Sequence, residues 1–195
     1  MDVAHKYKKG SIGTMVLDFI QSIVLALSVF VLIYMFVAQP NEVKGSSMFP
    51  NFEDKDYLLT DKLSYRFGNP QRGDVVVFKA PVTESCAETE CEYIKRIIGI
   101  PGDRIKVAGG KVYLNGELLK ENYLPDGTKT SPGTYSVEGV EKVIPANQYL
   151  CFGDNRGHSR DGREFGPVTK DRIVGRAFFR YWPSKSFGLV PRVRF

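Results

Sequence analysis

The longest apolar stretch of the chain runs from Phe19 to Ala38 and contains no charged residue. Only Gln21, Ser22 and Ser28 are clearly polar within it. A helix of about 20 residues spans about 30 Å, the thickness of a bilayer core. A cleaved signal peptide has an apolar region of about 7–15 residues, and a buried soluble helix shows a recurring polar face. The stretch therefore predicts a membrane anchor.

The residues before this stretch predict its orientation. Lys6, Lys8 and Lys9 precede it, and Asp2 barely offsets them. The positive-inside rule therefore keeps the N-terminus in the cytoplasm. No second stretch approaches 20 apolar residues, so we expect one span and one exported domain. The predicted parts are a cytoplasmic N-terminus (1–14), a transmembrane anchor (15–38) and an extracytoplasmic β-rich domain (39–195).

Apolar runs in the exported part have the composition of β-strands. Residues 75–78, 93–100 and 173–182 are rich in β-branched and aromatic side chains and are bounded by Gly or Pro. Asn115-Gly116 separates two short runs, which is the strongest local signal for a tight hairpin.

Few other regions carry a strong pattern. Helical periodicity is hard to find beyond the anchor, and residues 121–145 are rich in Gly, Pro, Thr and Ser, which predicts a long loop or hairpin excursion. Strand-like runs at a spacing of about 8–12 residues predict a closed or sandwiched antiparallel sheet system. The fold class is therefore mainly β, with an antiparallel catalytic domain exported behind a single N-terminal transmembrane helix.

Composition and charge exclude some classes of protein. With 43% hydrophobic and 25% charged residues and only 3 Cys, the chain is neither disordered nor a cysteine-dense scaffold. The net charge of +5 is compatible with nucleic acid or an anionic membrane as partner. However, the basic residues are scattered, and an exported domain does not meet nucleic acid. We therefore expect no nucleic-acid partner.

The cysteines suggest an oxidising compartment. Cys86 and Cys91 lie in a polar, loop-like stretch and could close a small disulfide loop. Free thiols or a zinc site are the alternatives, but zinc needs four ligands and only Cys151 and His158 remain as candidates. Cys151 belongs to an apolar run and is predicted to be a buried strand residue.

Several common kinds of site are poorly represented. The sequence has no phosphate-binding glycine loop, and the acidic loop 153–166 is interrupted by Arg156, Arg160 and Arg163, which disfavours calcium. His158 is the only histidine on the exported side, so a Ser-His-Asp triad has little support. A lysine base remains, provided that its site favours the neutral amine.

Lys95 is the candidate base and Ser47 the candidate nucleophile. Strand alternation places Tyr93, Lys95 and Ile97 on one face, where apolar neighbours would desolvate the amine and lower its pKa. Taken alone, the strand better fits a lysine that reaches past its neighbours to water. Ser47 lies in a turn bounded by glycine and proline, residues 45–50. By itself, such a turn is more often structural than catalytic.

Taken together and in order, four segments closely resemble the conserved boxes of the bacterial type I signal peptidases. They are the serine box Ser47-Met48-Phe49-Pro50, the box Arg72–Phe78, the lysine box Tyr93-Ile94-Lys95-Arg96 with its continuation Gly99–Asp103, and the final box Gly153-Asp154-Asn155-Arg156 with Ser159, Asp161 and Arg163. These boxes cover most of the exported domain and follow a membrane anchor.

The resemblance implies a role for each matching residue. Ser47 would be the nucleophile and Lys95 the general base, a Ser-Lys version of the catalytic triad. Ser159 would donate or accept a hydrogen bond that holds the lysine amine toward Ser47. The remaining implied roles are a structural ion pair near the site (Asp161 and Arg163, joined by Arg96) and small apolar substrate pockets (Met48, Tyr93 and Ile94).

The resemblance also implies the function. The protein would be a membrane-bound serine endopeptidase of the bacterial inner (cytoplasmic) membrane, with its catalytic domain on the outer side. It would cleave preprotein signal peptides at Ala-x-Ala-type sites through an acyl-enzyme, without cofactor or metal. Its partners would be preproteins, the lipid bilayer and the protein export machinery. The alternatives are a Ser-Lys peptidase dedicated to a conjugation or secretion system, and a non-catalytic membrane-tethered β-domain that binds exported proteins.

Five positions depart from the commonest family pattern: Gly45, Asn51, Gly157, His158 and Gly162. Gly45 stands where many members carry a serine that helps to bind the oxyanion, so the backbone N–H of Ser47 would be the main donor. Asn51 replaces the usual threonine after the proline, and His158 is expected to be a loop residue.

Overall fold

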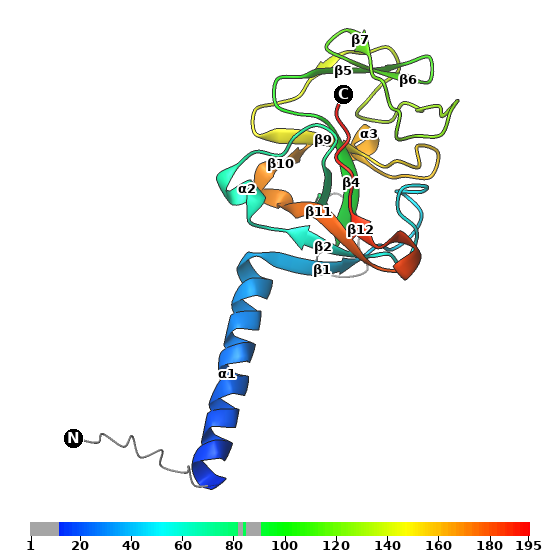
Figure 1. Ribbon diagram of the computed structural model, residues 1–195. Coiled ribbons are helices and arrows are strands. Elements are labelled where there is room, and N and C mark those ends of the chain that lie inside the picture. The colour runs from blue at the N-terminus through cyan, green and yellow to red at the C-terminus, as the bar shows by residue number, and fades with distance from the viewer. Residues whose placement is uncertain (1–11, 82–83, 85–90) are drawn as a thin grey trace, which may run out of the picture. The chain divides into compact units, whose positions relative to one another are not determined.

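The computed structural model describes residues 12–81, 84 and 91–195. It contains two compact units, one that ends at Val37 and one that comprises Ala38–Phe195 (Figure 1). We describe each unit by itself.

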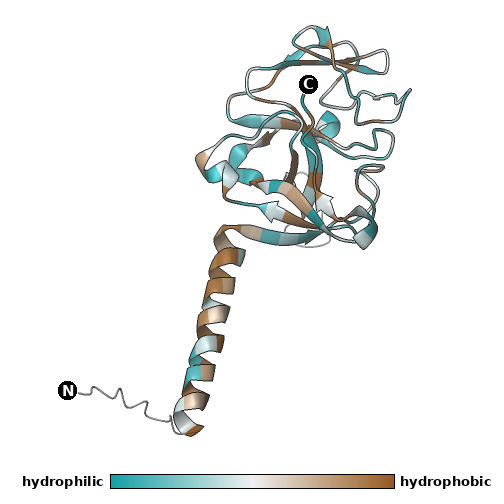
Figure 2. Cartoon of the chain, viewed as in Figure 1, coloured by the Kyte–Doolittle hydropathy of each residue, from teal (hydrophilic) through white to brown (hydrophobic). Residues whose placement is uncertain are grey.

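The first unit contains the helix α1 (Ile12–Phe36), and all of its described side chains are exposed. Figure 2 shows apolar residues along most of its length. The hydroxyls of Ser22 and Ser28 donate to carbonyls one turn earlier, which satisfies these polar groups within the helix. Within the part of the chain that the structure describes, α1 is the one helix long and apolar enough to cross a membrane.

The helix α1 begins at Ile12 and ends at Phe36, and Ala38 belongs to strand β1, where it pairs with Asp61.

The second unit contains a large antiparallel sheet, as predicted from the sequence (Figure 1). Its strands follow the order β1 (Ala38–Glu42), β2 (Tyr57–Asp61), β11 (Ile173–Trp182), β3 (Val75–Lys79), β4 (Glu92–Gly99), β9 (Gln148–Phe152) and β10 (Val168–Thr169), and β12 (Gly188–Leu189) pairs with β11. The predicted strands at 75–78, 93–100 and 173–182 correspond to β3, β4 and β11.

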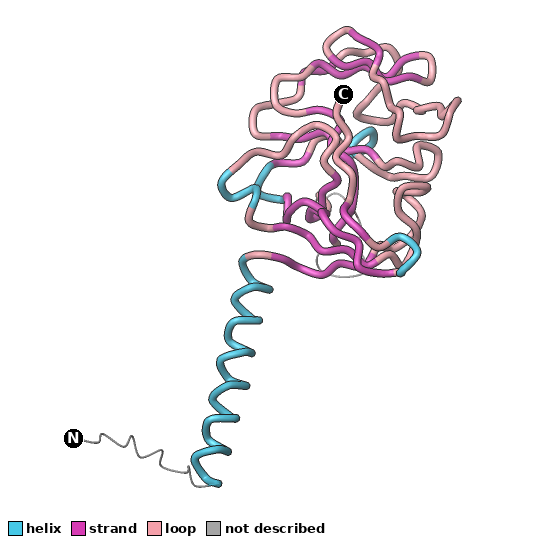
Figure 3. The backbone as a smooth tube through the Cα atoms, in the orientation of Figure 1, coloured by secondary structure: helices cyan, strands magenta, loops and turns pink. Residues whose placement is uncertain are grey.

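A smaller antiparallel sheet has the order β7 (Glu117–Leu118), β6 (Lys111–Leu114), β5 (Arg104–Ala108) and β8 (Lys142–Val143). The predicted hairpin joins β6 to β7, and its turn residues Asn115 and Gly116 have φ of 54° and 89°. Both positive angles are those of a two-residue hairpin turn. Residues 121–145 form loops apart from β8, as Figure 3 shows.

Only short helices accompany the sheets in the described part of this unit. They are α2 (Ser64–Phe67), α3 (Gly162–Phe165) and the 3-10 turns η1 (Lys170–Arg172) and η2 (Ser184–Ser186). The scarcity of helical periodicity in the sequence agrees with this arrangement.

Strand β3 explains why its sequence is a continuous apolar run. Val76 and Phe78 pack into one buried cluster, whereas Val75 packs into another on the opposite face. A strand that is buried on both faces needs apolar side chains at consecutive positions.

Strand β4 has an open edge where it approaches the serine turn. β3 pairs with β4 along Glu92–Arg96, but β9 pairs with it only from Arg96 onward. Among the described residues, Glu92–Lys95 thus has no strand partner on one side. Strand alternation places Lys95 and Arg96 on opposite faces of the sheet at this point.

Candidate active site

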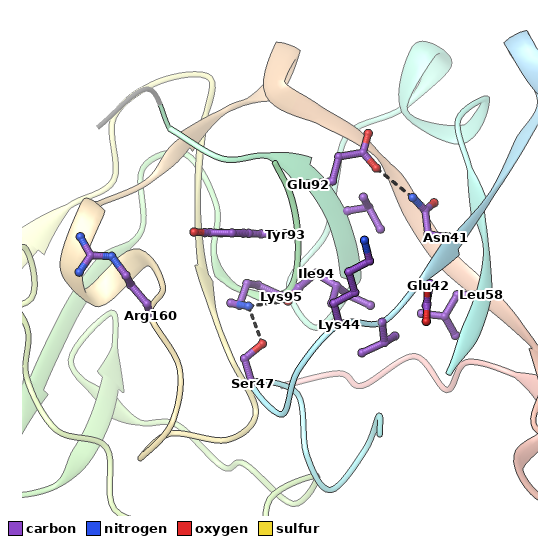
Figure 4. A pocket seen from close by; sticks show the side chains of 12 residues that line it. Asn41, Glu42, Lys44, Ser47, Leu58, Glu92, Tyr93, Ile94, Lys95 and Arg160 are labelled. Atoms are coloured by element: carbon purple, nitrogen blue, oxygen red, sulfur yellow. Dashed lines mark hydrogen bonds between the residues drawn. The ribbon is translucent and has the colours of Figure 1, made fainter. Parts of the chain in front are cut away.

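The Lys95 side chain lies against the serine turn. Its Nζ donates to Ser47 Oγ at 2.7 Å and to the Ile94 carbonyl at 2.9 Å (Figure 4). The Tyr93 ring lies 5.3 Å from Nζ, measured to the ring centroid. Lys95 is only 4% exposed, so the amine does not reach past its neighbours into bulk water.

Burial changes the acidity of this amine. Desolvation lowers the pKa of Lys95 to about 8, although the negative charge of Asp161 opposes the shift. At pH 7, a pKa of about 8 leaves about one amine in ten neutral, several hundred times the fraction for an exposed lysine. A neutral amine can accept a proton, so the 2.7 Å contact with Ser47 Oγ is a path for proton transfer.

The backbone of the serine turn is held from both sides. Gly45 has a φ of 83°, and its N–H donates to Asp54. The Asn155 N–H donates to the Ser47 carbonyl at 3.0 Å, and its side-chain amide donates to the Ser46 carbonyl at 3.0 Å. These contacts fix the position of Ser47. Among the described residues, none accepts a hydrogen bond from the Ser47 N–H.

A buried ion pair, Arg96 with Asp154, lies next to the serine turn. Arg96 donates from Nε and Nη2 to the two carboxylate oxygens of Asp154 at 2.9 and 2.6 Å, and both side chains are almost fully buried. Asn51, directly after the serine turn, also donates to this carboxylate at 2.9 Å. The pair therefore connects β4, the serine turn and the loop after β9.

The sequence analysis placed Arg96 with Asp161 and Arg163, and the structure separates them. Asp161 and Arg163 do pair, at 2.8 Å, and Asp161 also accepts the N–H of Gly153. Arg96 pairs with Asp154 instead, and both carboxylate oxygens of Asp161 accept from Arg163.

The expected hydrogen bond between Ser159 and Lys95 is not formed. The Ser159 hydroxyl is buried and has no hydrogen-bond partner among the described residues, while the amine donates to Ser47 and Ile94. Ser159 instead packs over Gly153, where an added Cβ would lie 2.1 Å from its Oγ.

A cavity of about 240 Å³ opens beside Ser47 and Lys95. Tyr93 and Ile94 line it, as the sequence analysis expected. Met48 does not line it, because its side chain is 0% exposed and packs into a core cluster.

The cavity has further walls that the sequence analysis missed. Its apolar lining is supplied by Val43, Leu58 and Val77, and its polar lining by Asn41, Glu42, Lys44, Glu92 and Arg160 (Figure 4). Strand alternation along β3 could have identified Val77 as a lining residue. The other lining residues could not be identified from local sequence, because they reach the cavity through the pairing of distant strands.

The cysteines and the histidine take no part in the contact between Lys95 and Ser47. Cys91 is disulfide-bonded, and Cys86 lies outside the described residues. Cys151 is a buried strand residue, as expected, and burial raises the pKa of its thiol. His158 is exposed. The described residues hold no cluster of three His, Cys, Asp or Glu side chains suited to a metal ion.

Comparisons with known proteins agree on one family. Residues 16–182 match the family described as signal peptidase, peptidase S26. A probable signal peptidase I-2 of Synechocystis sp. is 38% identical over 170 residues, which cover 87% of this chain and 75% of that protein. A signal peptidase IB of Staphylococcus aureus is 33% identical over 183 residues, which cover 88% and 92%. A crystal structure of a signal peptidase I from Enterococcus faecalis is 25% identical, with a TM-score of 0.45 over 56% of this chain and 97% of that chain.

Gly153 offers a test of the packing around the serine turn. A Cβ at this position would lie 2.5 Å from the Ser47 carbonyl oxygen, so Gly153→Ala should lower the free energy of unfolding by about 1–3 kcal/mol. Gly157→Ala is the control, because a Cβ there meets nothing within 4 Å. Thermal unfolding of both variants measures the difference, and equal stability would contradict the described packing.

Proposed function

The chain belongs to the signal peptidase family, peptidase S26, and we propose that it cleaves signal peptides with Ser47 as nucleophile and Lys95 as general base. It is a membrane-anchored serine endopeptidase that acts on preproteins. The observation that carries the Ser-Lys assignment is the 2.7 Å contact between a buried lysine amine and a serine hydroxyl.

The proposed reaction begins with neutral Lys95. Its amine takes the Ser47 proton while Oγ attacks the scissile carbonyl carbon. The carbonyl oxygen becomes an oxyanion, and the Ser47 N–H donates to it. The lysine ammonium then gives its proton to the leaving amine as the peptide bond breaks, which leaves an acyl-enzyme. A water molecule that Lys95 deprotonates hydrolyses the ester and restores Ser47.

The open edge of β4 suggests how the substrate binds. Residues Glu92–Lys95 have unpaired backbone groups on one side, and an extended peptide can add to such an edge as a further strand. The residue before the scissile bond would then enter the cavity beside Ser47. A cavity bounded by Tyr93 and Ile94 fits a small apolar side chain, which supports a preference for Ala-x-Ala-type sites.

The surrounding residues hold the dyad without touching the substrate. Asp161 and Arg163 form an ion pair under the final loop, and Ser159 lies beside Gly153 with a free hydroxyl within the described part of the chain. We assign no cofactor to this mechanism.

The first test removes each member of the dyad. Ser47→Ala and Lys95→Ala should each lower preprotein cleavage by more than about 1000-fold, because nucleophile and base act as a unit. Cleavage assays with the purified full chain measure the loss, and thermal unfolding checks the fold. Ser46→Ala is the matched control and should retain most activity. Near-normal turnover by a folded Lys95→Ala variant would refute the assignment.

The second test uses pH. The neutral amine is the active form, so kcat/KM should rise with pH to a plateau, with a midpoint near the Lys95 pKa of about 8. Below the midpoint it should fall about tenfold per pH unit. Lys95→Arg should be inactive throughout. A profile that stays flat down to about pH 5 would mean that another group is the base.

The third test concerns location. We propose a single pass through the bacterial inner membrane, with residues 1–14 in the cytoplasm, residues 15–38 as the anchor and residues 39–195 outside, near the bilayer and the export machinery. The basis is the three lysines before the span. Protease added to spheroplasts should digest the exported domain and leave a small N-terminal fragment. Full protection of the chain would indicate the opposite orientation.

A further inference from the structure

A second cavity, of about 390 Å³, lies outside the active site and is lined by basic side chains. Its walls come in part from α2 and the beginning of β11, which pack side by side (Figure 1). Lys62, Arg66 and Lys170 line it, and Asp171 supplies the one carboxylate among the described lining residues. The proposed cleavage reaction uses none of these four side chains, so the cavity is a candidate site for a separate anion.

The two lysine amines carry charge that no described carboxylate neutralises in an ion pair. Lys62 Nζ donates to Gln39 Oε1 at 3.4 Å. Lys170 Nζ donates to the Gly68 carbonyl at 2.9 Å and to Asn69 Oδ1 at 2.8 Å. These acceptors are all uncharged, and an ammonium has three N–H donors. Both amines can therefore still donate to an anionic ligand.

Chain connectivity places this cavity near the membrane surface. The anchor helix α1 ends at Phe36, and Gln39, whose side chain contacts the Lys62 amine, follows three residues later. Three residues of extended chain reach about 10 Å. The polar headgroup layer is about 5–8 Å deep on each side of the hydrocarbon core, and a charge acts over about 8 Å at physiological salt. Lys62 is therefore close enough to act on lipid phosphates.

Exposed apolar side chains lie beside the cations in sequence. Phe67, the last residue of α2, follows Arg66 and is 86% exposed, and Leu63 follows Lys62 and is 39% exposed. Basic residues interleaved with exposed apolar ones are typical of surfaces that lie in a membrane interface, where the apolar groups enter the acyl boundary. A free phosphate would gain nothing from Phe67, so this arrangement favours a lipid headgroup.

We propose that Lys62, Arg66 and Lys170 bind the phosphate of an anionic phospholipid headgroup, with Phe67 in the acyl boundary beside it. The site is separate from signal-peptide cleavage and rests only on the proposed location of the catalytic domain near the bilayer. Together with the anchor, it gives this domain a second attachment to the membrane.

The first experiment measures headgroup preference. The full chain in a neutral detergent is mixed with equal amounts of phosphatidylglycerol and phosphatidylcholine, and native mass spectrometry counts the lipids retained. Lys62→Gln and Lys170→Gln should each lower the ratio of retained phosphatidylglycerol to phosphatidylcholine about fivefold, the effect of one cation at an anionic surface. Lys62→Arg keeps the charge and should keep most of the preference. Lys111→Gln is the matched control, because this exposed lysine lies on β6 of the smaller sheet, and it should leave the ratio unchanged.

The second experiment reports the position of α2. Trp182 is the single tryptophan, so Phe67→Trp in a Trp182→Phe background places one fluorophore at the end of this helix. In vesicles, brominated acyl chains should quench it more strongly when phosphatidylglycerol is present than in phosphatidylcholine alone. Replacing both Lys62 and Lys170 by glutamine should remove this difference.

An unchanged lipid ratio in both glutamine variants would overturn the headgroup site. Displacement of phosphatidylglycerol by an equal concentration of inorganic phosphate would indicate a site for a free anion and would also overturn it. If the full chain does not float with phosphatidylcholine vesicles, the proposed membrane location fails and the site fails with it. A wild type that keeps the phosphatidylglycerol preference but does not cleave preprotein would support the site and overturn the proposed function.

Discussion

Two adjacent basic residues on strand β4, Lys95 and Arg96, are both buried, but only Arg96 is paired with a carboxylate among the described residues. Arg96 points to one face, where the Asp154 carboxylate accepts two of its hydrogen bonds. Lys95 points to the other, where its nearest partners are a hydroxyl and a carbonyl oxygen. The carboxylate of Asp154 compensates the charge of the buried guanidinium. Burial without such a paired carboxylate lowers the pKa of the Lys95 amine. The same strand therefore supplies a structural ion pair and a base.

The ion pair also fixes the position of the nucleophile. Asp154 accepts a hydrogen bond from Asn51, directly after the serine turn, and the next residue, Asn155, donates to the Ser47 carbonyl. The Arg96–Asp154 pair therefore lies where three segments that are distant in sequence meet. Lys95, the neighbour of Arg96 on β4, lies with its amine 2.7 Å from Ser47 Oγ.

Several strands could be predicted because β-branched and aromatic residues are concentrated within each of them, and this can be read from the local sequence. The runs that became β3, β4 and β11 are dense in β-branched residues, and the Asn115-Gly116 turn carries its own conformational signal. Strand β1 was missed because it is polar and contains Pro40, and it forms through pairing with β2. The dyad was found through the resemblance of ordered motifs. The partner of Arg96 depends on tertiary packing, which local sequence does not encode.

The central claim is that burial makes Lys95 a base near neutral pH, and a direct titration of its side chain tests it best. With lysine labelled at 13Cε, the resonance that is missing from Lys95→Arg identifies this residue, and its chemical shift reports protonation of the amine. We expect a midpoint near pH 8, in keeping with the pKa of about 8 that burial produces. A lysine side chain that is free in water titrates at about pH 10.4. A Lys95 midpoint at that value would contradict the account.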